Sequence, residues 1–228
     1  MFTLDHVVLW GRSFDEYQRM FALSASDLDG RILGCADGPA SFNAEATRRG
    51  HRVVSCDPVY GFARAQIQAR IDDSCDQILN QTRQNADRFV WKDGIRDVDE
   101  LRDVRMKAMR DFLADYDTGR HEGRYLDAGL PALPFADSSF DLALCSHLLF
   151  LYSIQLGEDF HLTALRELRR VARDVRVFPL LALDGQRSPF VERCVDELTA
   201  GGSQVTIEQV PYEFQQGGNE MLRVRANR

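Results

Sequence analysis

The sequence predicts a single α/β domain built on a mostly parallel sheet, with helices on both faces and an antiparallel hairpin near its carboxyl end. Three observations support this fold class. Short apolar runs typical of strands alternate with segments whose apolar residues recur at helical spacing. The chain has 228 residues, enough for one well-buried core but too few for two full domains. Two late strand-like segments are joined by a short glycine-rich loop, so they must run antiparallel.

The first half of the chain contains a β-α-β unit. Residues 31–35 and 52–56 are short apolar runs that end in turn or polar residues, and residues 44–49 between them are typical of a helix. A strand, a helix and a second strand in this order predict a parallel pair of strands. Upstream, the apolar residues of 14–23 recur at helical spacing, which predicts a helix that packs on the sheet.

A helical insertion is expected between the second and third strands. Residues 63–78 are predicted to form the crossover helix, but the next strand-like run, residues 123–128, follows much later. Within this gap, residues 99–116 show a helical pattern flanked by charges. The single domain, residues 1–228, would therefore carry an insertion at about 79–121. It is expected to act as a lid that offers aromatic and cationic side chains to a substrate, namely Phe89, Trp91, Arg102, Arg105 and Arg110. For each arginine taken separately, a solvated amphipathic helix that covers a sheet face is the preferred interpretation.

The alternation of strands and helices continues to the end of the chain. Strands are predicted at residues 139–145 and 175–183, helices at 158–172 and 189–200, and the closing hairpin at 204–214 and 220–226. The predicted sheet therefore has six or seven strands.

Composition and charge argue against several classes of function. A formal net charge of −7 disfavours nucleic acid as a partner, because binding phosphate backbones calls for a basic face. No stretch approaches the ~18 apolar residues of a membrane span, and no signal peptide is evident, so we expect a soluble, cytoplasmic protein without a membrane partner. The five cysteines show no CxxC pair and no zinc-type spacing, so no metal is expected. They are Cys35, Cys56, Cys75, Cys145 and Cys194. The sequence does not indicate an oligomeric state.

The most informative segment is residues 31–43, a strand that runs into a turn of small residues and then a helix. Small side chains let the backbone approach a ligand closely, and the amino end of the helix faces the same place. Asp57 closes the next strand about twenty residues later, where a carboxylate can accept hydrogen bonds from the hydroxyls of an adenosine ribose. Ordinary turns at Gly38-Pro39 and Asp57-Pro58 are the alternative interpretation.

A third segment makes the pattern specific. Residues 130–145 read Leu-Pro-Ala-Leu-Pro-Phe-Ala-Asp-Ser-Ser-Phe-Asp-Leu-Ala-Leu-Cys. Together with the turn and Asp57, this segment resembles class I S-adenosylmethionine (SAM)-dependent methyltransferases. In that family a small-residue turn, an acidic second-strand end and an LPF-x-D-x-S-F-D run recur in this order. The resemblance spans about residues 33–226. It implies a Rossmann-like sheet of seven strands, SAM as the cofactor and S-adenosylhomocysteine (SAH) as its product.

The resemblance also implies which residues hold the cofactor. The turn from Ala36 to Gly38 would pack on the methionine part of SAM, Asp57 would bind the ribose, and Pro58 would lie beside the adenine. The full implied site comprises Gly34, Cys35, Ala36, Asp37, Gly38, Asp57, Pro58, Gly129, Leu130 and Ser146.

Two positions depart from the family pattern. An acidic residue usually stands near the end of the first strand, where this chain has Gly34; either Asp37 compensates or cofactor binding is weakened. The residue that reaches the adenine amino group appears as Gly129, with Asp127 close by.

The candidate catalytic residue is His147, directly after the predicted strand 139–145. Methyl transfer from a sulfonium is an in-line displacement, so the protein mainly has to align the reactants. An acceptor that must lose a proton needs a base, and histidine titrates in the useful range. A histidine that caps the strand end, or bonds a backbone carbonyl, would look the same. Tyr152 and Tyr60 are expected at the same mouth, although core packing is an equal alternative for Tyr60.

These features predict a SAM-dependent methyltransferase whose acceptor is a small molecule that the sequence does not identify. A non-catalytic SAM-binding or structural module of the same fold is an alternative, because of the departure at Gly34. An NAD(P)-dependent oxidoreductase also uses a small-residue turn and an acidic strand end. It needs a fuller GxGxxG motif than residues 34–40 provide.

Overall fold

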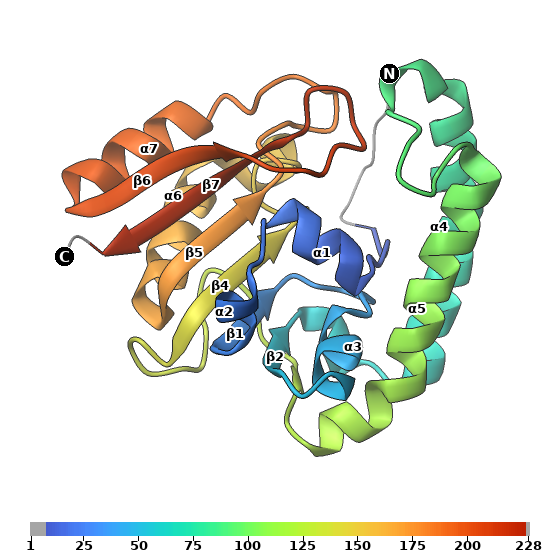
Figure 1. The fold of residues 1–228 in the computed structure, drawn as a ribbon, viewed down its shortest axis with the longest axis horizontal. Coiled ribbons are helices and arrows are strands. Elements are labelled where there is room, and N and C mark those ends of the chain that lie inside the picture. The colour runs from blue at the N-terminus through green and yellow to red at the C-terminus, as the bar shows by residue number, and fades with distance from the viewer. Residues whose placement is uncertain (1–7, 227–228) are drawn as a thin grey trace.

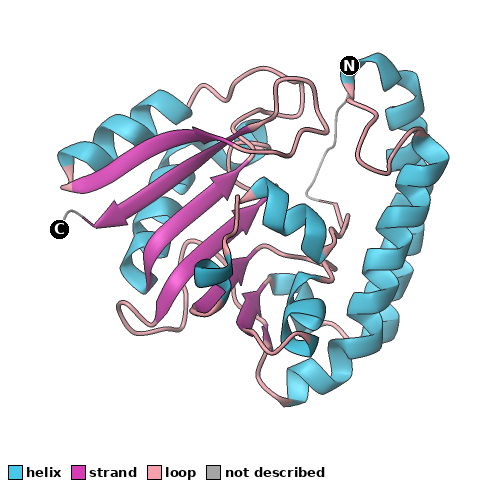
Figure 2. Cartoon of the chain, in the orientation of Figure 1, coloured by secondary structure: helices cyan, strands magenta, loops and turns pink. Residues whose placement is uncertain are grey.

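The computed structural model describes residues 8–226 and contains one seven-stranded sheet with helices packed around it (Figure 1; Figure 2). The strands are β1 (Arg31–Cys35), β2 (Arg52–Cys56), β3 (Tyr125–Leu126), β4 (Phe140–Ser146), β5 (Ala172–Phe178), β6 (Ser203–Gln209) and β7 (Glu220–Ala226). Their order is β3-β2-β1-β4-β5-β7-β6. The first five are parallel, and β7 runs antiparallel between β5 and β6. This is the Rossmann-like arrangement that the resemblance implies, so the predicted fold class is confirmed.

The helices form two layers and a separate pair. They are α1 (Phe14–Met20), α2 (Ala25–Leu28), α3 (Phe42–Arg48), α4 (Arg64–Gln84), α5 (Val98–His121), α6 (Ser153–Val171) and α7 (Val191–Ala200), with 3-10 turns η1 (Pro58–Gly61) and η2 (Ala86–Arg88). Helices α6 and α7 contribute to the core on one face of the sheet, and α1 and α3 to the core on the other. The long helices α4 and α5 stand side by side beyond the β2 and β3 edge (Figure 1). None of the helices within residues 8–226 is long and apolar enough to cross a membrane.

The central strands are apolar on both faces, which is why they stand out in the sequence. In β1 only Arg31 is exposed. Ile32 packs into the core on the α1 and α3 side, whereas Leu33 and Cys35 belong to the core on the α6 and α7 side. A strand between two parallel neighbours needs this near-continuous burial.

The region expected as an insertion is filled by the end of α4, by η2 and by α5. Helix α4 continues past its expected end at Ile78, because no glycine or proline interrupts it before Asn85 and because Leu79 packs with Val98 at the start of α5. At its other end α5 brings Phe112 and Tyr116 against Tyr60 and Tyr125, so the pair is anchored at the sheet edge.

The other differences from the predicted boundaries have local causes. Strand β5 ends at Phe178 instead of residue 183, because Pro179 has no N–H with which to extend the ladder. Strand β6 ends at Gln209 instead of residue 214, and β3 keeps only two paired residues. The helix predicted at 158–172 begins earlier, at Ser153.

A buried ion pair fastens α1 to α5. Glu16 and Arg105 are only 2% and 0% exposed, and Arg105 Nη1 donates to both carboxylate oxygens of Glu16. The Tyr212 hydroxyl donates to Glu16 Oε1 at 3.0 Å, and the Ser13 N–H donates to Oε2 at 3.0 Å. Burial by itself would raise the pKa of Glu16, but the charge and hydrogen bonds of Arg105 hold that pKa at about 2. The pair therefore joins α1, α5 and the segment between β6 and β7.

Replacing Glu16 by Gln should lower the free energy of unfolding by about 3–5 kcal/mol, because the Arg105 guanidinium then stays buried without a carboxylate. Urea denaturation measures this loss. The matched control is Asp99→Asn, which breaks an exposed pair with Arg83 and should change the value by less than about 1 kcal/mol. Equal effects of the two substitutions would contradict the conclusion that the buried pair of Glu16 and Arg105 matters more to stability than an exposed pair.

Candidate functional site

The turn after β1 brings backbone to the carboxyl edge of the sheet. Ala36 and Gly38 both have positive φ, of 57° and 51°. The Ala36 N–H donates to the Cys56 carbonyl at 2.9 Å, and the Gly38 N–H donates to Asp57 Oδ2 at 2.9 Å. A Cβ on Gly38 would meet nothing nearer than 3.9 Å, so this backbone is open to a neighbouring group. The turn is thus held by β2 on one side and is accessible on the other.

Asp37 occupies the space over Gly34. A Cβ added to Gly34 would lie 1.8 Å from Asp37 Oδ2, so the carboxyl group lies where a side chain of residue 34 would start. The Tyr17 hydroxyl donates to Asp37 Oδ1 at 2.8 Å, and the Ser55 hydroxyl donates to Oδ2 at 2.6 Å. Burial raises the pKa of Asp37 to about 6 in spite of these hydrogen bonds. The Asp37 carboxyl group therefore lies at the end of β1, over Gly34.

Asp57 ends β2 and faces the same turn. Its Oδ1 accepts the Val59 N–H at 2.9 Å and so caps η1, while Oδ2 accepts the Gly38 N–H. Burial raises the pKa of Asp57, and the two backbone hydrogen bonds oppose this rise. Each carboxylate oxygen can accept a second hydrogen bond, so Asp57 is fixed in position and still able to bind hydroxyl groups.

Ser146 and His147 lie at the end of β4. The Ser146 hydroxyl and His147 Nδ1 are 2.8 Å apart, and the His147 N–H donates to the Phe178 carbonyl at 2.7 Å. The imidazole packs against the edge of the Phe178 ring. Burial lowers the pKa of His147 well below 6.5, and the charges of Arg12 and Arg105 lower it further. The ring is therefore uncharged at neutral pH and able to accept a proton.

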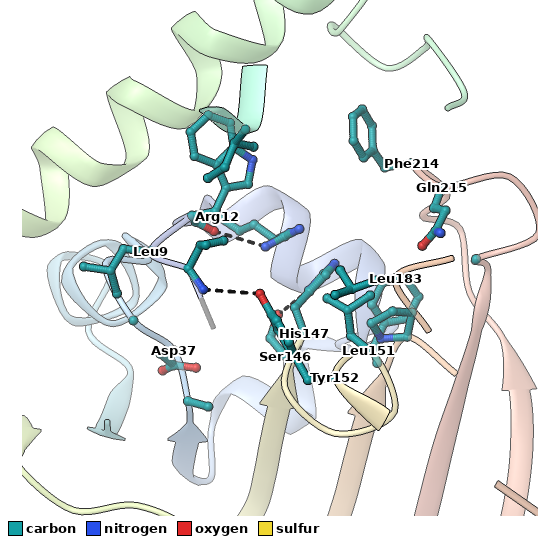
Figure 3. A pocket seen from close by; sticks show the side chains of 18 of the residues that line it. Leu9, Arg12, Asp37, Ser146, His147, Leu151, Tyr152, Leu183, Phe214 and Gln215 are labelled. Atoms are coloured by element: carbon teal, nitrogen blue, oxygen red, sulfur yellow. Dashed lines mark hydrogen bonds between the residues drawn. The ribbon is translucent and has the colours of Figure 1, made fainter. Parts of the chain in front are cut away.

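These groups meet in one cavity of about 150 Å³ (Figure 3). Of the residues proposed from the sequence, it is lined by Ala36, Asp37, Gly38, Asp57, Ser146 and His147. The remaining five, Gly34, Cys35, Pro58, Gly129 and Leu130, do not line it. Cys35 lies in the core behind the turn. Gly129 packs against Pro58, whose Cγ lies 3.0 Å from the position that a Cβ on Gly129 would take.

Residues 8–226 contain no group of three or more side chains that could hold a metal ion together.

The remaining lining of the cavity comes from residues that the sequence patterns did not single out. It includes Leu9, Arg12, Tyr212, Phe214 and Gln215 (Figure 3). The Val8 N–H donates to the Tyr152 hydroxyl at 3.3 Å, so the amino-terminal segment runs along the cavity to the loop after β4. Ser13 and Glu16 form a capping box that marks the start of α1 in the sequence, but nothing there indicates that Arg12 faces a cavity.

The aromatic and lid residues divide between cavity and core. Tyr152 lines the cavity as expected, whereas Tyr60 lies in the core and donates its hydroxyl to the Gly38 carbonyl at 2.8 Å. Of the proposed lid residues only Phe89 lines the cavity. Arg105 is buried against Glu16, which gives that arginine a structural role instead.

One relative decides the family. The chain is 34% identical over 224 residues to the uncharacterized protein MJ0045 of Methanocaldococcus jannaschii, covering 98% of both chains. The chain belongs to the MJ0045 family. No protein-family model matches it. For this member of the MJ0045 family, activity therefore has to be argued from the cavity itself.

Two solved structures illustrate the more distant similarity. Magnesium protoporphyrin IX methyltransferase from Synechocystis, solved with bound SAM, has a TM-score of 0.49 and 9% identity, with 94% of this chain and 78% of that chain covered. A possible histamine N-methyltransferase from Thermotoga maritima has a TM-score of 0.45 and 13% identity, with 94% and 90% covered. Similarity at this level carries no information on activity or substrate.

Asp37 predicts a pH effect on stability. Its pKa of about 6 in the folded chain lies above the ordinary 3.8, so the folded state holds a proton that the unfolded state releases in this interval. The contribution of Asp37 to the free energy of unfolding is therefore fully present below about pH 4. It falls by about 3 kcal/mol in total as the pH rises through about 6. Urea denaturation of the wild type and Asp37→Asn at both ends of this interval measures it. The wild type should lose about 3 kcal/mol relative to the variant, and a constant difference would contradict the raised pKa.

Proposed function

We propose that this protein binds SAM and transfers its methyl group to a small-molecule acceptor. The observation that carries the proposal is the convergence of three groups in one cavity: the open backbone of Gly38, the fixed carboxylate of Asp57 and the uncharged imidazole of His147. They come from the ends of β1, β2 and β4, the edge where ligands bind in open α/β sheets. The class I methyltransferase pattern in residues 130–145 points to SAM as the ligand.

The residues present fit the cofactor. The backbone from Ala36 to Gly38 approaches the cavity without a side chain at Gly38, which suits close contact with the methionine part. Asp57 has one free lone pair on each oxygen for the two ribose hydroxyls. The resemblance assigns the adenine to Pro58, Gly129 and Leu130, which lie outside the cavity lining, with Gly129 packed against Pro58.

The chemistry that SAM supplies when bound is a methyl group on a sulfonium, ready for in-line displacement. The protein has to align the acceptor and exclude water. Leu151, Phe178 and Leu183 provide an apolar wall for this purpose. In the tautomer in which His147 Nδ1–H donates to the Ser146 oxygen, Nε2 carries the free lone pair and would take a proton from an acceptor hydroxyl or amine.

Calorimetric titration with SAM and SAH tests the cofactor, with NAD as a control ligand. Replacing Asp57 by Ala should weaken both adenosyl ligands by about 10- to 100-fold, because two hydrogen bonds to a charged group are lost. Asp103→Ala, which removes an exposed carboxylate on α5, should leave both affinities unchanged. Binding of NAD in preference to SAH would refute the proposal in favour of an oxidoreductase.

The role of His147 is tested with an acceptor found by screening small phenols, amines and thiols for SAH formation. His147→Ala should slow SAH formation by about 100- to 10,000-fold, the range for loss of a general base, without changing SAH affinity. Because the pKa of His147 lies well below 6.5, this residue stays unprotonated between about pH 8 and pH 6.5. Protonation of His147 should therefore not lower the wild-type rate in this range. His121→Ala, at an exposed site at the end of α5, is the control. A wild-type rate in His147→Ala would remove His147 from the chemistry.

A further inference from the structure

One half of the cavity is cationic. This half lies over β4, β5 and β7 and is lined by Arg12, His147, Leu151, Phe178, Tyr212 and Phe214. The Arg12 carbonyl accepts the Ser41 N–H just after the turn at 3.0 Å, and its side chain is drawn above Ser146 and His147 in Figure 3. Arg12 is partly buried, and the charged side chains near it are Arg105 and Glu16. A partly buried charge calls for a partner.

Arg12 has no anionic partner within the part of the chain that the structure describes. Its Nη1 donates to the carbonyl of Trp10, in its own segment, at 3.1 Å. Its Nε is buried and has no hydrogen-bond partner in residues 8–226. Burial lowers the pKa of Arg12, and the nearby Arg105 lowers it further, yet an arginine stays protonated at neutral pH.

The nearest carboxylate is already used. Glu16 accepts hydrogen bonds from Arg105 on both oxygens, from Tyr212 on Oε1 and from Ser13 on Oε2. Two guanidinium groups therefore share one carboxylate, and one positive charge is left over beside the cavity. A buried charge without a partner opposes folding, so it is expected where a ligand supplies the partner.

The surplus charge acts on the acceptor side of the cavity. The charge of Arg12 lowers the pKa of His147 and opposes the burial-driven rise in the pKa of Tyr152. Arg12 is thus electrostatically coupled to the candidate base.

We propose that Arg12 binds a carboxylate group of the methyl acceptor, and that the acceptor is a small molecule with an apolar, preferentially aromatic, body. This inference rests on the proposed methyltransferase function and adds the chemical class of its substrate. The guanidinium forms charge-assisted hydrogen bonds to the carboxylate, which holds the acceptor. Phe178, Phe214 and Leu151 cover its apolar body, and His147 faces the atom that receives the methyl group.

The test compares carboxylates with their neutral amides on SAH-loaded protein. Benzoate and phenylacetate are titrated against benzamide and phenylacetamide by ligand-observed NMR, on the wild type, Arg12→Gln, Arg12→Lys and the control Arg110→Gln, which removes an exposed charge on α5. The carboxylates should bind the wild type and the control about tenfold or more tighter than the amides. The preference should vanish in Arg12→Gln and be partly kept in Arg12→Lys.

Two outcomes overturn the inference. One is equal binding of carboxylates and amides to the wild type, or a preference that survives in Arg12→Gln. The other is a fall in SAH affinity of about tenfold or more in Arg12→Gln, with 5′-methylthioadenosine, which lacks the amino-acid part, bound as before. Arg12 would then bind the carboxylate of the cofactor itself. If the wild type fails to bind SAH, the proposed function fails. The same carboxylate and amide titrations without SAH then show separately whether Arg12 binds anions.

Thermal unfolding without ligand is the second readout. Because Arg12 is the unpaired member of the cluster, Arg12→Gln should leave the melting temperature unchanged or raise it by a few degrees, about 2–4 °C for each kcal/mol regained. A fall of that size would mean that Arg12 stabilises the fold, and the inference would be wrong.

Discussion

The contact between Glu16 and Arg105 determines the geometry on which the cavity depends. It joins the first turn of α1 to the middle of α5, and Tyr212 adds the segment that connects β6 and β7. These three elements are far apart in the sequence, and each contributes a residue to the cavity lining, namely Tyr17, Leu101 and Tyr212. Burying two charges has a desolvation cost, and the attraction between the charges offsets this cost only when their geometry is correct. A buried ion pair of this kind therefore favours one arrangement of the elements that it joins more than it adds to net stability. The position of Arg12, four residues before Glu16, follows from this anchor.

The two ends of the cavity have opposite electrostatic character. At the turn, burial raises the pKa of both Asp37 and Asp57, and the charge of Asp57 raises that of Asp37 further. At the other end, burial lowers the pKa of His147, and the charges of Arg12 and Arg105 lower it further, so the imidazole is uncharged. Under the proposed function a cationic sulfonium would lie nearer the carboxylates, and an anionic acceptor nearer the guanidinium groups. Like charges would then be kept apart while the reacting atoms meet between the two ends.

Local sequence predicted one half of this site and could not predict the other. Strands β1 and β2 and the turn after β1 were predictable because buried parallel strands are continuously apolar and because a tight turn selects small residues. The position of Asp57 follows from the same pattern. Arg12, Tyr212 and Gln215 lie in segments without such constraints, and only the tertiary packing of α1, α5 and β7 brings them to the cavity. The end of α4 was misplaced for a related reason: its last turns are stabilised by contact with α5, which a local pattern does not reveal.

The exchange of roles between Gly34 and Asp37 has a consequence for the history of this chain. The two side chains would compete for the same volume, since a Cβ on Gly34 would overlap the carboxyl group of Asp37. A mutation that adds a side chain at one position is therefore tolerated only with a small residue at the other. Positions 34 and 37 should therefore carry one carboxylate between them in evolution. An alignment of relatives should show the acidic residue at position 34 in some lineages and at position 37 in others, and seldom at both.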